Sequence, residues 1–189
     1  MIEPGKNNLI VTAHPDDETL WCGGLPIRFK DRNWTVVCCT TPRADPIRAV
    51  KFHDACRILG FKKVYISSRI EPAYDGVIEF EDYMYQIGVS SFDAIFTHNP
   101  GGEYGHPHHK QVNRFVQANC SDTGLFFFGY GAHVGVIHDQ ITLDSQEYSQ
   151  KLAALKCYDH QSPLDAQPKW KALLDRYFPN GGFHCESYC

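Results

Sequence analysis

One short stretch of the sequence gathers the side-chain types that bind metal ions and move protons. Residues 13–18 read A-H-P-D-D-E and place one imidazole and three carboxylates within five positions. Pro15 restricts His14 to an extended conformation, and Asp16 or Asp17 could cap a helix that follows. Taken alone, the stretch is equally consistent with a capped helix start and with a catalytic site.

A second stretch, residues 105–109 with the sequence G-H-P-H-H, offers three more imidazoles. His106 and His109 are three positions apart, so they lie on roughly one side of a helix start, whereas His108 is expected to point elsewhere. Two histidines and one carboxylate from two distant loops form a three-ligand set with an open position, which a catalytic zinc requires. The metal lowers the pKa of bound water to about 7, and a carboxylate outside the ligand set can accept the proton. We therefore expect one of the adjacent aspartates, Asp16 and Asp17, to bind the metal and the other to accept the proton.

The apolar pattern around the two stretches alternates between strands and helices. Predicted strands cover residues 7–13, 35–41, 64–67 and 93–97, and predicted helices cover residues 18–32, 46–59, 81–88 and 107–119. The later part is less regular, with strands predicted at 125–130 and 141–143 and helices at 149–158 and 169–178. Continuous apolar strands separated by helices imply a parallel sheet covered on both faces. The predicted fold class is α/β, a single Rossmann-like three-layer α/β/α domain over residues 1–189 with a mostly parallel sheet, and functional loops are expected at the carboxyl ends of the strands.

Length and composition exclude several classes of protein. The chain has 189 residues, 43% of them hydrophobic and 21% charged, which fits one ordinary globular domain and not a disordered or fibrous chain. The formal net charge is −4 and no basic run occurs, which disfavours binding to a nucleic acid polymer. No signal-like start or bilayer-length apolar stretch is found, so we expect a cytoplasmic protein that has no membrane partner. The eight cysteines are scattered without a C-x-x-C pair, and we expect most of them to be reduced core residues.

The pair of motifs A-H-P-D-D-E and G-H-P-x-H resembles the LmbE/PIG-L family of zinc-dependent N-acetylglucosaminyl deacetylases. Weaker similarities extend the resemblance to residues 48–60 (R-A-V-K-F-H-D-A-C-R-I-L-G), 151–162 and 186–188. Because two motifs match in the right order, the resemblance is more specific than either motif alone.

The resemblance implies a role for each matching residue. Zn²⁺ would be bound by His14, Asp17 and His109, Asp16 would be the general base, and His106 would stabilise or protonate the tetrahedral intermediate. Activated water would attack the acetamide carbonyl, and a proton would be delivered to the departing amine. The implied activity is that of a metal-dependent amidohydrolase, which acts on a carbon–nitrogen bond other than a peptide bond.

Two positions depart from the family pattern. His108 stands where the family usually has an acidic residue, and Lys51 stands where a glutamate is common. Without a carboxylate partner, His106 is less readily protonated. We therefore expect either a weaker acid at His106 or a substitute partner such as Asp139 or Glu103.

Residues next to the two motifs are candidates for the rest of the site. Tyr104 could donate a hydrogen bond to an oxyanion, although a packed loop aromatic is an equally good interpretation. Arg43 and Arg48 follow the second predicted strand and could bind a substrate hydroxyl or anionic group. His98 and Asn99 follow a predicted strand at the same edge, and we expect them either to support the residues of the site or to line it, with Asn99 as a substrate-binding residue. Packing or surface roles are expected for the other histidines, which are His53, His133, His138, His160 and His184.

Two other interpretations remain open from the sequence. His14, Asp16 and His109 also satisfy the two-histidine, one-carboxylate triad of non-haem iron oxygenases, although the alternating strands and helices do not suit that class. The protein could also be a non-catalytic module in which zinc stabilises the fold. For an enzyme, the expected substrate is a small soluble N-acyl compound, most simply an N-acetylated amino sugar such as N-acetylglucosamine or its conjugate. A second subunit of a homo-oligomer could complete the site of so short a chain.

Overall fold

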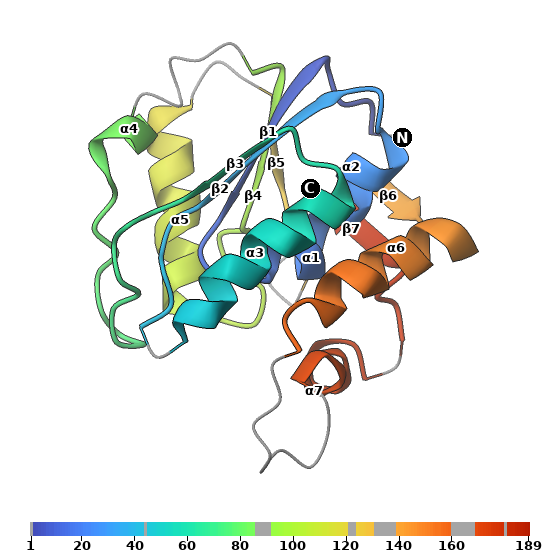
Figure 1. Cartoon of the computed structure of the whole chain (residues 1–189). Helices are drawn as coiled ribbons and strands as arrows, with labels where there is room; N and C mark the ends of the chain where they lie inside the picture. Colours follow the sequence, from blue (N-terminus) through green and yellow to red (C-terminus); the bar gives the residue numbers. More distant parts are fainter. Residues whose placement is uncertain are drawn as a thin grey trace.

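A five-stranded parallel sheet forms the centre of the molecule (Figure 1). The computed structural model describes residues 2–43, 45–85, 92–120, 124–130, 139–159, 169–179 and 181–189. The sheet has the order β3-β2-β1-β4-β5, with β1 (Asn7–Thr12), β2 (Asn33–Cys38), β3 (Lys63–Ile66), β4 (Ala94–Thr97) and β5 (Gly124–Phe127). Two further strands, β6 (Asp139–Thr142) and β7 (Cys185–Tyr188), pair antiparallel in a second sheet. The predicted α/β class with a mostly parallel sheet is confirmed.

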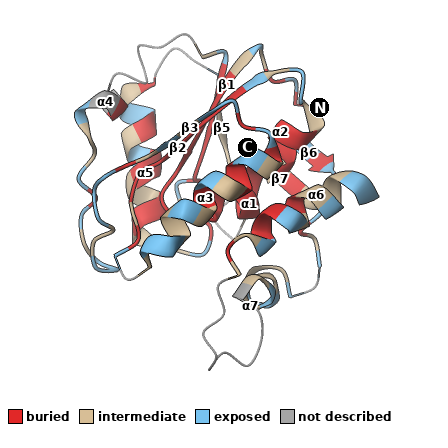
Figure 2. Cartoon of the chain, viewed as in Figure 1, coloured by how far each residue is buried: buried red, intermediate tan, exposed pale blue. Residues whose placement is uncertain are grey.

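Helices cover both faces of the parallel sheet. On one side lie α1 (Asp17–Cys22), α2 (Gly24–Arg28), α3 (Pro46–Leu59) and α6 (Ser145–Lys156), and on the other lie α4 (Asp82–Tyr85) and α5 (Pro107–Asn119) (Figure 1). The last helix, α7 (Lys169–Tyr177), packs apolar side chains against the same core as α6. Successive residues of β1 face opposite sides, because Ile10 belongs to the core beneath α3 and α6 whereas Leu9 and Val11 belong to the core beneath α5. The central strands are therefore buried on both faces, as Figure 2 shows.

The strand order reverses direction at β1. The chain builds β1, β2 and β3 outward in one direction and then returns to place β4 on the other side of β1. Ligands bind outside the carboxyl ends of the strands at such a reversal point. Residues 13–18 follow β1 and residues 98–109 follow β4, so the fold brings the two motif stretches together there.

Several helix limits differ from the predicted ones because local contacts decide them. The predicted helix 18–32 is divided into α1 and α2 at Gly23, where a Cβ atom would lie 3.0 Å from the carbonyl oxygen of Thr19. α6 begins at Ser145, four residues before the predicted start, because Asp144 and Glu147 form a capping box. β7 was not predicted, and the end of the predicted helix 81–88 lies outside the described residues.

A buried ion pair attaches β7 to the helices that carry the first motif. Lys151 of α6 donates to Glu186 of β7 at 2.7 Å, and both side chains are nearly inaccessible. Glu186 also accepts the N–H of Gly24, the first residue of α2, at 2.7 Å. A Cβ atom at Gly24 would lie 2.9 Å from the same carboxylate, so the close approach needs glycine. The C-terminal strand thereby fixes the position of α2 directly after α1.

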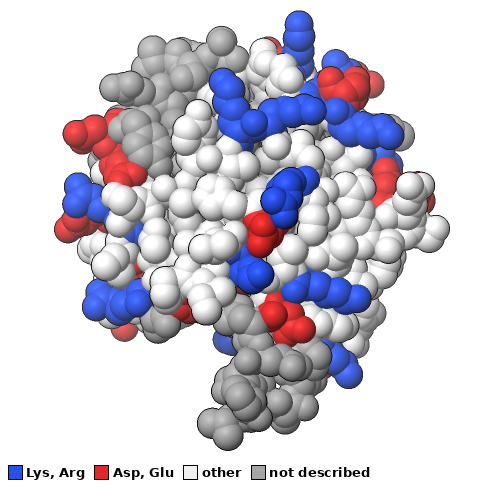
Figure 3. Space-filling view, viewed as in Figure 1, with Lys and Arg blue, Asp and Glu red and all other residues white. Residues whose placement is uncertain are grey.

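The remaining chain-wide features agree with the composition. All eight cysteines are free and five of them are buried, as expected for reduced core residues. Acidic and basic side chains are interspersed on the face shown in Figure 3, without a large patch of one sign. None of the helices in the described part of the chain is long and apolar enough to cross a bilayer.

Candidate metal centre

The carboxylate of Asp17, the first residue of α1, lies at the centre of the clustered side chains. Its Oδ2 accepts the backbone N–H of His14 at 2.8 Å, and its Oδ1 accepts the indole N–H of Trp21 at 3.0 Å. His14 Nδ1 and His109 Nε2 each lie 3.4 Å from this carboxylate. Burial opposes the charge, yet the imidazoles of His109 and His98 hold the pKa of Asp17 well below its usual range. Asp17 is therefore an ionised carboxylate with two imidazole nitrogens beside it.

His109 presents a nitrogen without a partner to the same point. Its Nδ1–H donates to Glu103 Oε2 at 2.5 Å, so Nε2 carries the lone pair. This Nε2 is buried and has no hydrogen-bond partner among the described residues, a state that costs about 1–3 kcal/mol. Donor atoms of His14, Asp17 and His109 all lie within 4.8 Å of one another. A divalent cation fits these residues, because it would use the free lone pair and balance the buried carboxylate.

Glu103 orients His109 through a hydrogen bond at Nδ1, the ring nitrogen that does not face Asp17. The sequence did not indicate this role. Glu103 Oε2 accepts from His98 Nδ1 at 2.9 Å as well as from His109, and its Oε1 accepts the backbone N–H of Asn99. Burial opposes ionisation, but His98 and the hydrogen bonds from both imidazoles lower the pKa of Glu103 to about 2. A carboxylate behind a ligating histidine fixes the tautomer of that histidine. The expectation that Glu103 partners His106 is therefore wrong.

Asp16 lies next to these residues but its carboxylate faces Arg48 of α3, with which it forms an ion pair. Its φ of 106° is strained for a residue with a side chain, and a hydrogen bond from its N–H to Glu18 Oε2 at 2.9 Å holds it there. Glu18 in turn accepts the hydroxyl of Tyr158 at 2.7 Å. Burial raises the pKa of Asp16, and Arg48 opposes that rise. The structure thus places Arg48, which was expected to bind substrate, as the partner of Asp16.

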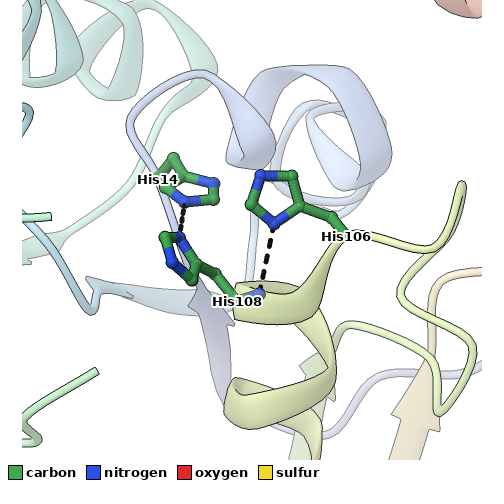
Figure 4. Close-up of side chains that lie close together, drawn as sticks. All are labelled: His14, His106 and His108. Atoms are coloured by element: carbon green, nitrogen blue, oxygen red, sulfur yellow. Dashed lines mark hydrogen bonds between the residues drawn. The ribbon is translucent and has the colours of Figure 1, made fainter. Parts of the chain in front are cut away.

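A hydrogen bond connects the rings of His14 and His108 (Figure 4). The Nε2–H of His108 donates to the carbonyl of Ala73 at 3.1 Å, so its Nδ1 accepts from His14 Nε2–H at 3.0 Å. His14 then carries its lone pair on Nδ1, the nitrogen next to Asp17. The expectation that His108 points elsewhere is wrong, because its fully buried ring lies against His14 and fixes the tautomer of that residue.

His106 caps the start of α5 with one of its two ring nitrogens. Its Nδ1 accepts the backbone N–H of His108 at 3.2 Å, which leaves Nε2 as a donor. The ring stacks on His109 with centroids 4.6 Å apart. Burial and the neighbouring imidazoles lower the pKa of His106 to about 3. Asp139, the other expected partner of His106, lies in β6 and is not among the groups that act most strongly on this pKa.

Aromatic side chains from distant parts of the chain pack beside the cluster. We call this set the aromatic wall, and it consists of Trp21, Tyr104, Tyr130, Tyr177 and Phe178. Tyr104 is 40% exposed, and its ring centroid lies 5.7 Å from His106 and 5.5 Å from His109. Its ring centroid lies 4.9 Å from that of Tyr177. Trp21 could have been found from the sequence, because it is one turn after Asp17 on the same helix.

The other sequence candidates lie farther from the cluster. Asn99 is fully buried, and its amide donates to the carbonyl oxygens of Phe128 and Tyr130, so it braces the loops after β4 and β5. Arg43 is exposed and its Nε donates to the carbonyl oxygen of Glu71 at 3.3 Å. Three of the remaining histidines lie outside the described residues, and these are His133, His138 and His160.

Comparison with known proteins adds a family and a set of shared folds. Residues 9–120 match the family described as PIG-L: GlcNAc-PI de-N-acetylase. The uncharacterized protein L374 of Acanthamoeba polyphaga mimivirus is 21% identical over 149 residues, which cover 67% of this chain and 63% of that protein. The match therefore spans less than two thirds of that relative.

Solved structures similar to this chain include proteins with different reactions. The conserved protein TT1542 from Thermus thermophilus has a TM-score of 0.67 and 20% identity, with 97% of this chain and 94% of that chain covered. N,N'-diacetylchitobiose deacetylase from Pyrococcus horikoshii has a TM-score of 0.65 and 19% identity, with 97% and 83% covered. GalB, the 4-carboxy-2-hydroxymuconate hydratase from Pseudomonas putida, has a TM-score of 0.66 and 13% identity, with 97% and 95% covered. These likenesses show the fold, which both a deacetylase and a hydratase use.

Glu103→Gln tests the orientation of His109. We expect the variant to bind a divalent metal about 10–100-fold more weakly, because a neutral amide replaces the carboxylate that fixes the ring. Competition with a chelator of known affinity measures the dissociation constant. Glu79→Gln, at a side chain that is 76% exposed, is the matched control and should bind as the unaltered protein does. Equal affinities for the two variants would contradict the role of Glu103.

Proposed function

The chain belongs to the PIG-L family of GlcNAc-PI de-N-acetylases, and we propose that it is a metal-dependent hydrolase that removes N-acetyl groups from small amino-sugar-type substrates. One observation carries the proposal. His14, Asp17 and His109 converge on one point, where His109 holds an unpartnered lone pair, and a separate carboxylate, Asp16, lies beside them. Three ligands leave a position for water, as catalytic sites do.

Zn²⁺ is the ion that we assign to this donor set of two imidazoles and one carboxylate. Bound there, it would supply Lewis acidity, which lowers the pKa of water and polarises a carbonyl group. Glu103 and His108 support the two histidines from behind by fixing their tautomers. The iron oxygenase interpretation needs Asp16 as a ligand, but that carboxylate is paired with Arg48. The geometry therefore favours hydrolysis.

Asp16 is suited to move the proton of the attacking water. It is buried next to Asp17, and the Arg48 guanidinium opposes the effect of burial on its pKa, which favours the ionised form that a base requires. After accepting the proton, the same carboxylate can deliver it to the departing amine nitrogen. Arg48 and the hydrogen bond to Glu18 keep Asp16 in one orientation for both steps.

His106 is suited to stabilise the tetrahedral intermediate as a neutral donor. The backbone N–H of His108 occupies its Nδ1, so Nε2–H is available for the developing oxyanion. The pKa of about 3 means that the ring is uncharged near neutral pH. Of the two roles that the family resemblance implied, stabilisation therefore fits this site better than protonation. Tyr104 could provide a second hydrogen bond from its hydroxyl group.

The aromatic wall supports an amino-sugar-type substrate. Trp21 is buried, whereas Tyr104 is 40% exposed and its ring centroid lies 4.9 Å from that of the half-buried Tyr177, so the accessible part of the wall beside the cluster is aromatic. Such a surface can pack against the apolar face of a sugar ring while its polar groups bind sugar hydroxyls. We propose N-acetylglucosamine or a conjugate of it as the first compound to test.

Asp16→Asn tests the hydrolytic mechanism. The variant should lose about 10²–10⁴-fold in kcat, the usual contribution of a general base, and should keep its zinc, because Asp16 is not a ligand. Acetate release from N-acetylglucosamine, its phosphates and its nucleotide conjugates measures kcat, and elemental analysis measures zinc. Asp31→Asn, at a side chain that is 71% exposed, is the matched control. Unchanged turnover in Asp16→Asn would rule out this base, and a zinc-loaded protein without any acetate release would favour the non-catalytic module.

His106→Gln and His106→Ala separate a neutral hydrogen-bond donor from a charged acid. If His106 acts as a neutral donor, alanine should lower kcat by about 10²–10³-fold, whereas glutamine, which keeps an N–H, should retain a large part of the activity. A neutral donor adds no ionisation to the catalytic step. The kcat–pH profiles of the unaltered enzyme and of His106→Gln should therefore have the same limbs. Equal losses in both variants, together with the disappearance of one limb in His106→Gln, would show that His106 acts as an imidazolium acid.

A further inference from the structure

Three further donor atoms lie on the opposite side of the His14 ring from Asp17. They are His14 Nε2, His108 Nδ1 and Glu71 Oε1, which come from three separate segments of the chain. His14 Nε2 lies 3.0 Å from His108 Nδ1 and 3.3 Å from Glu71 Oε1, and the remaining pair is 4.0 Å apart. Two ligands of a tetrahedral zinc site lie about 3.3 Å apart, given bond lengths of about 2.0–2.1 Å. The triangle is therefore of a size that one metal ion can fill.

The hydrogen bonds of these residues leave the donor atoms directed at that triangle. The Ala73 carbonyl engages His108 Nε2–H, so the lone pair of His108 is on Nδ1. Glu71 is held by its backbone, because its N–H donates to the carbonyl oxygen of Thr41 at 2.7 Å, and its side chain is 25% exposed. An ion can thus reach this point from solvent through the Glu71 side.

We propose that His14 Nε2, His108 Nδ1 and Glu71 Oε1 form a second site for a transition-metal dication, which shares His14 with the first site. Two imidazoles and a carboxylate suit Zn²⁺, Ni²⁺ and Cu²⁺. When the first site is filled through His14 Nδ1, the second ion replaces the proton on Nε2. That proton would be released to solvent. His108, the departure from the family pattern, supplies the ligand that the first site does not use.

Occupation of the second site inhibits the proposed hydrolysis. His14, His106 and His108 each offer a nitrogen within 4.8 Å of the others. An ion held there can bind His106 Nε2 when the ring proton moves to Nδ1, and that tautomer no longer donates from Nε2 to an oxyanion. Inhibition rests on the proposed function, whereas the second site itself does not. Metal stoichiometry and turnover are therefore measured separately.

Equilibrium dialysis of the metal-free, full-length protein against Zn²⁺, with elemental analysis, tests the proposal. We expect two equivalents for the unaltered protein and for the control Glu79→Gln. Glu71→Gln should keep the tighter equivalent and raise the dissociation constant of the weaker one by more than about tenfold. His108→Leu should also lose the weaker equivalent. If His108→Leu does not fold, the dissociation constants of Glu71→Gln alone test the second site.

Each outcome separates the second site from the first. One equivalent in the unaltered protein would overturn the second site and leave the proposed hydrolase standing, whereas no bound zinc would overturn both. Two equivalents of unchanged affinity in Glu71→Gln would show that the second ion lies elsewhere. In acetate-release assays, excess zinc should inhibit the unaltered enzyme more than tenfold more strongly than Glu71→Gln, and equal inhibition would contradict the competition for His106.

Discussion

The buried carboxylate of Asp17 is the group on which the arrangement of the site depends. It lies at the start of α1, where the chain leaves β1 and meets residues that follow β4, and its charge is removed from water there. A buried charge must be compensated by hydrogen bonds and opposite charge. The backbone N–H of His14 and the indole N–H of Trp21 provide part of this compensation. A divalent cation would provide the rest, so metal binding and the positions of both loops depend on one another.

The two histidines beside Asp17 are supported in chemically different ways. Glu103 stands behind His109 with a full negative charge, whereas a neutral imidazole, His108, stands behind His14. A carboxylate makes the ligand in front of it more basic, and a neutral ring does so less. His108 therefore fixes the tautomer of His14 without adding a charge, and it places a further nitrogen at the outer side of the cluster.

The apolar pattern was sufficient to predict the parallel sheet and the meeting of the two motifs, because buried parallel strands have continuous apolar runs and their carboxyl ends share an edge. It could not predict where individual side chains point. Asp16 and Glu103 both have positive φ, and these backbone conformations turn one carboxylate to Arg48 and the other to His109. Spacing on an ideal helix misplaced His108 for a different reason, because His106 is the cap of α5 and has an extended backbone. The aromatic wall could not be predicted either, because Tyr177 of α7 is far from α1 in the sequence and meets Trp21 only in the folded chain.

The fold alone does not determine the reaction, because structures of this shape include a deacetylase and a hydratase. In the proposed mechanism, an ion with an open coordination position next to Asp16 would set the chemistry. A crystal structure of the protein loaded with one equivalent of zinc, with anomalous data at the zinc edge, tests this most directly. We predict one peak at about 2.0–2.2 Å from His14 Nδ1, Asp17 and His109 Nε2, with water as the fourth ligand. A zinc ion held by four protein side chains, or one bound away from Asp17, would contradict the catalytic site.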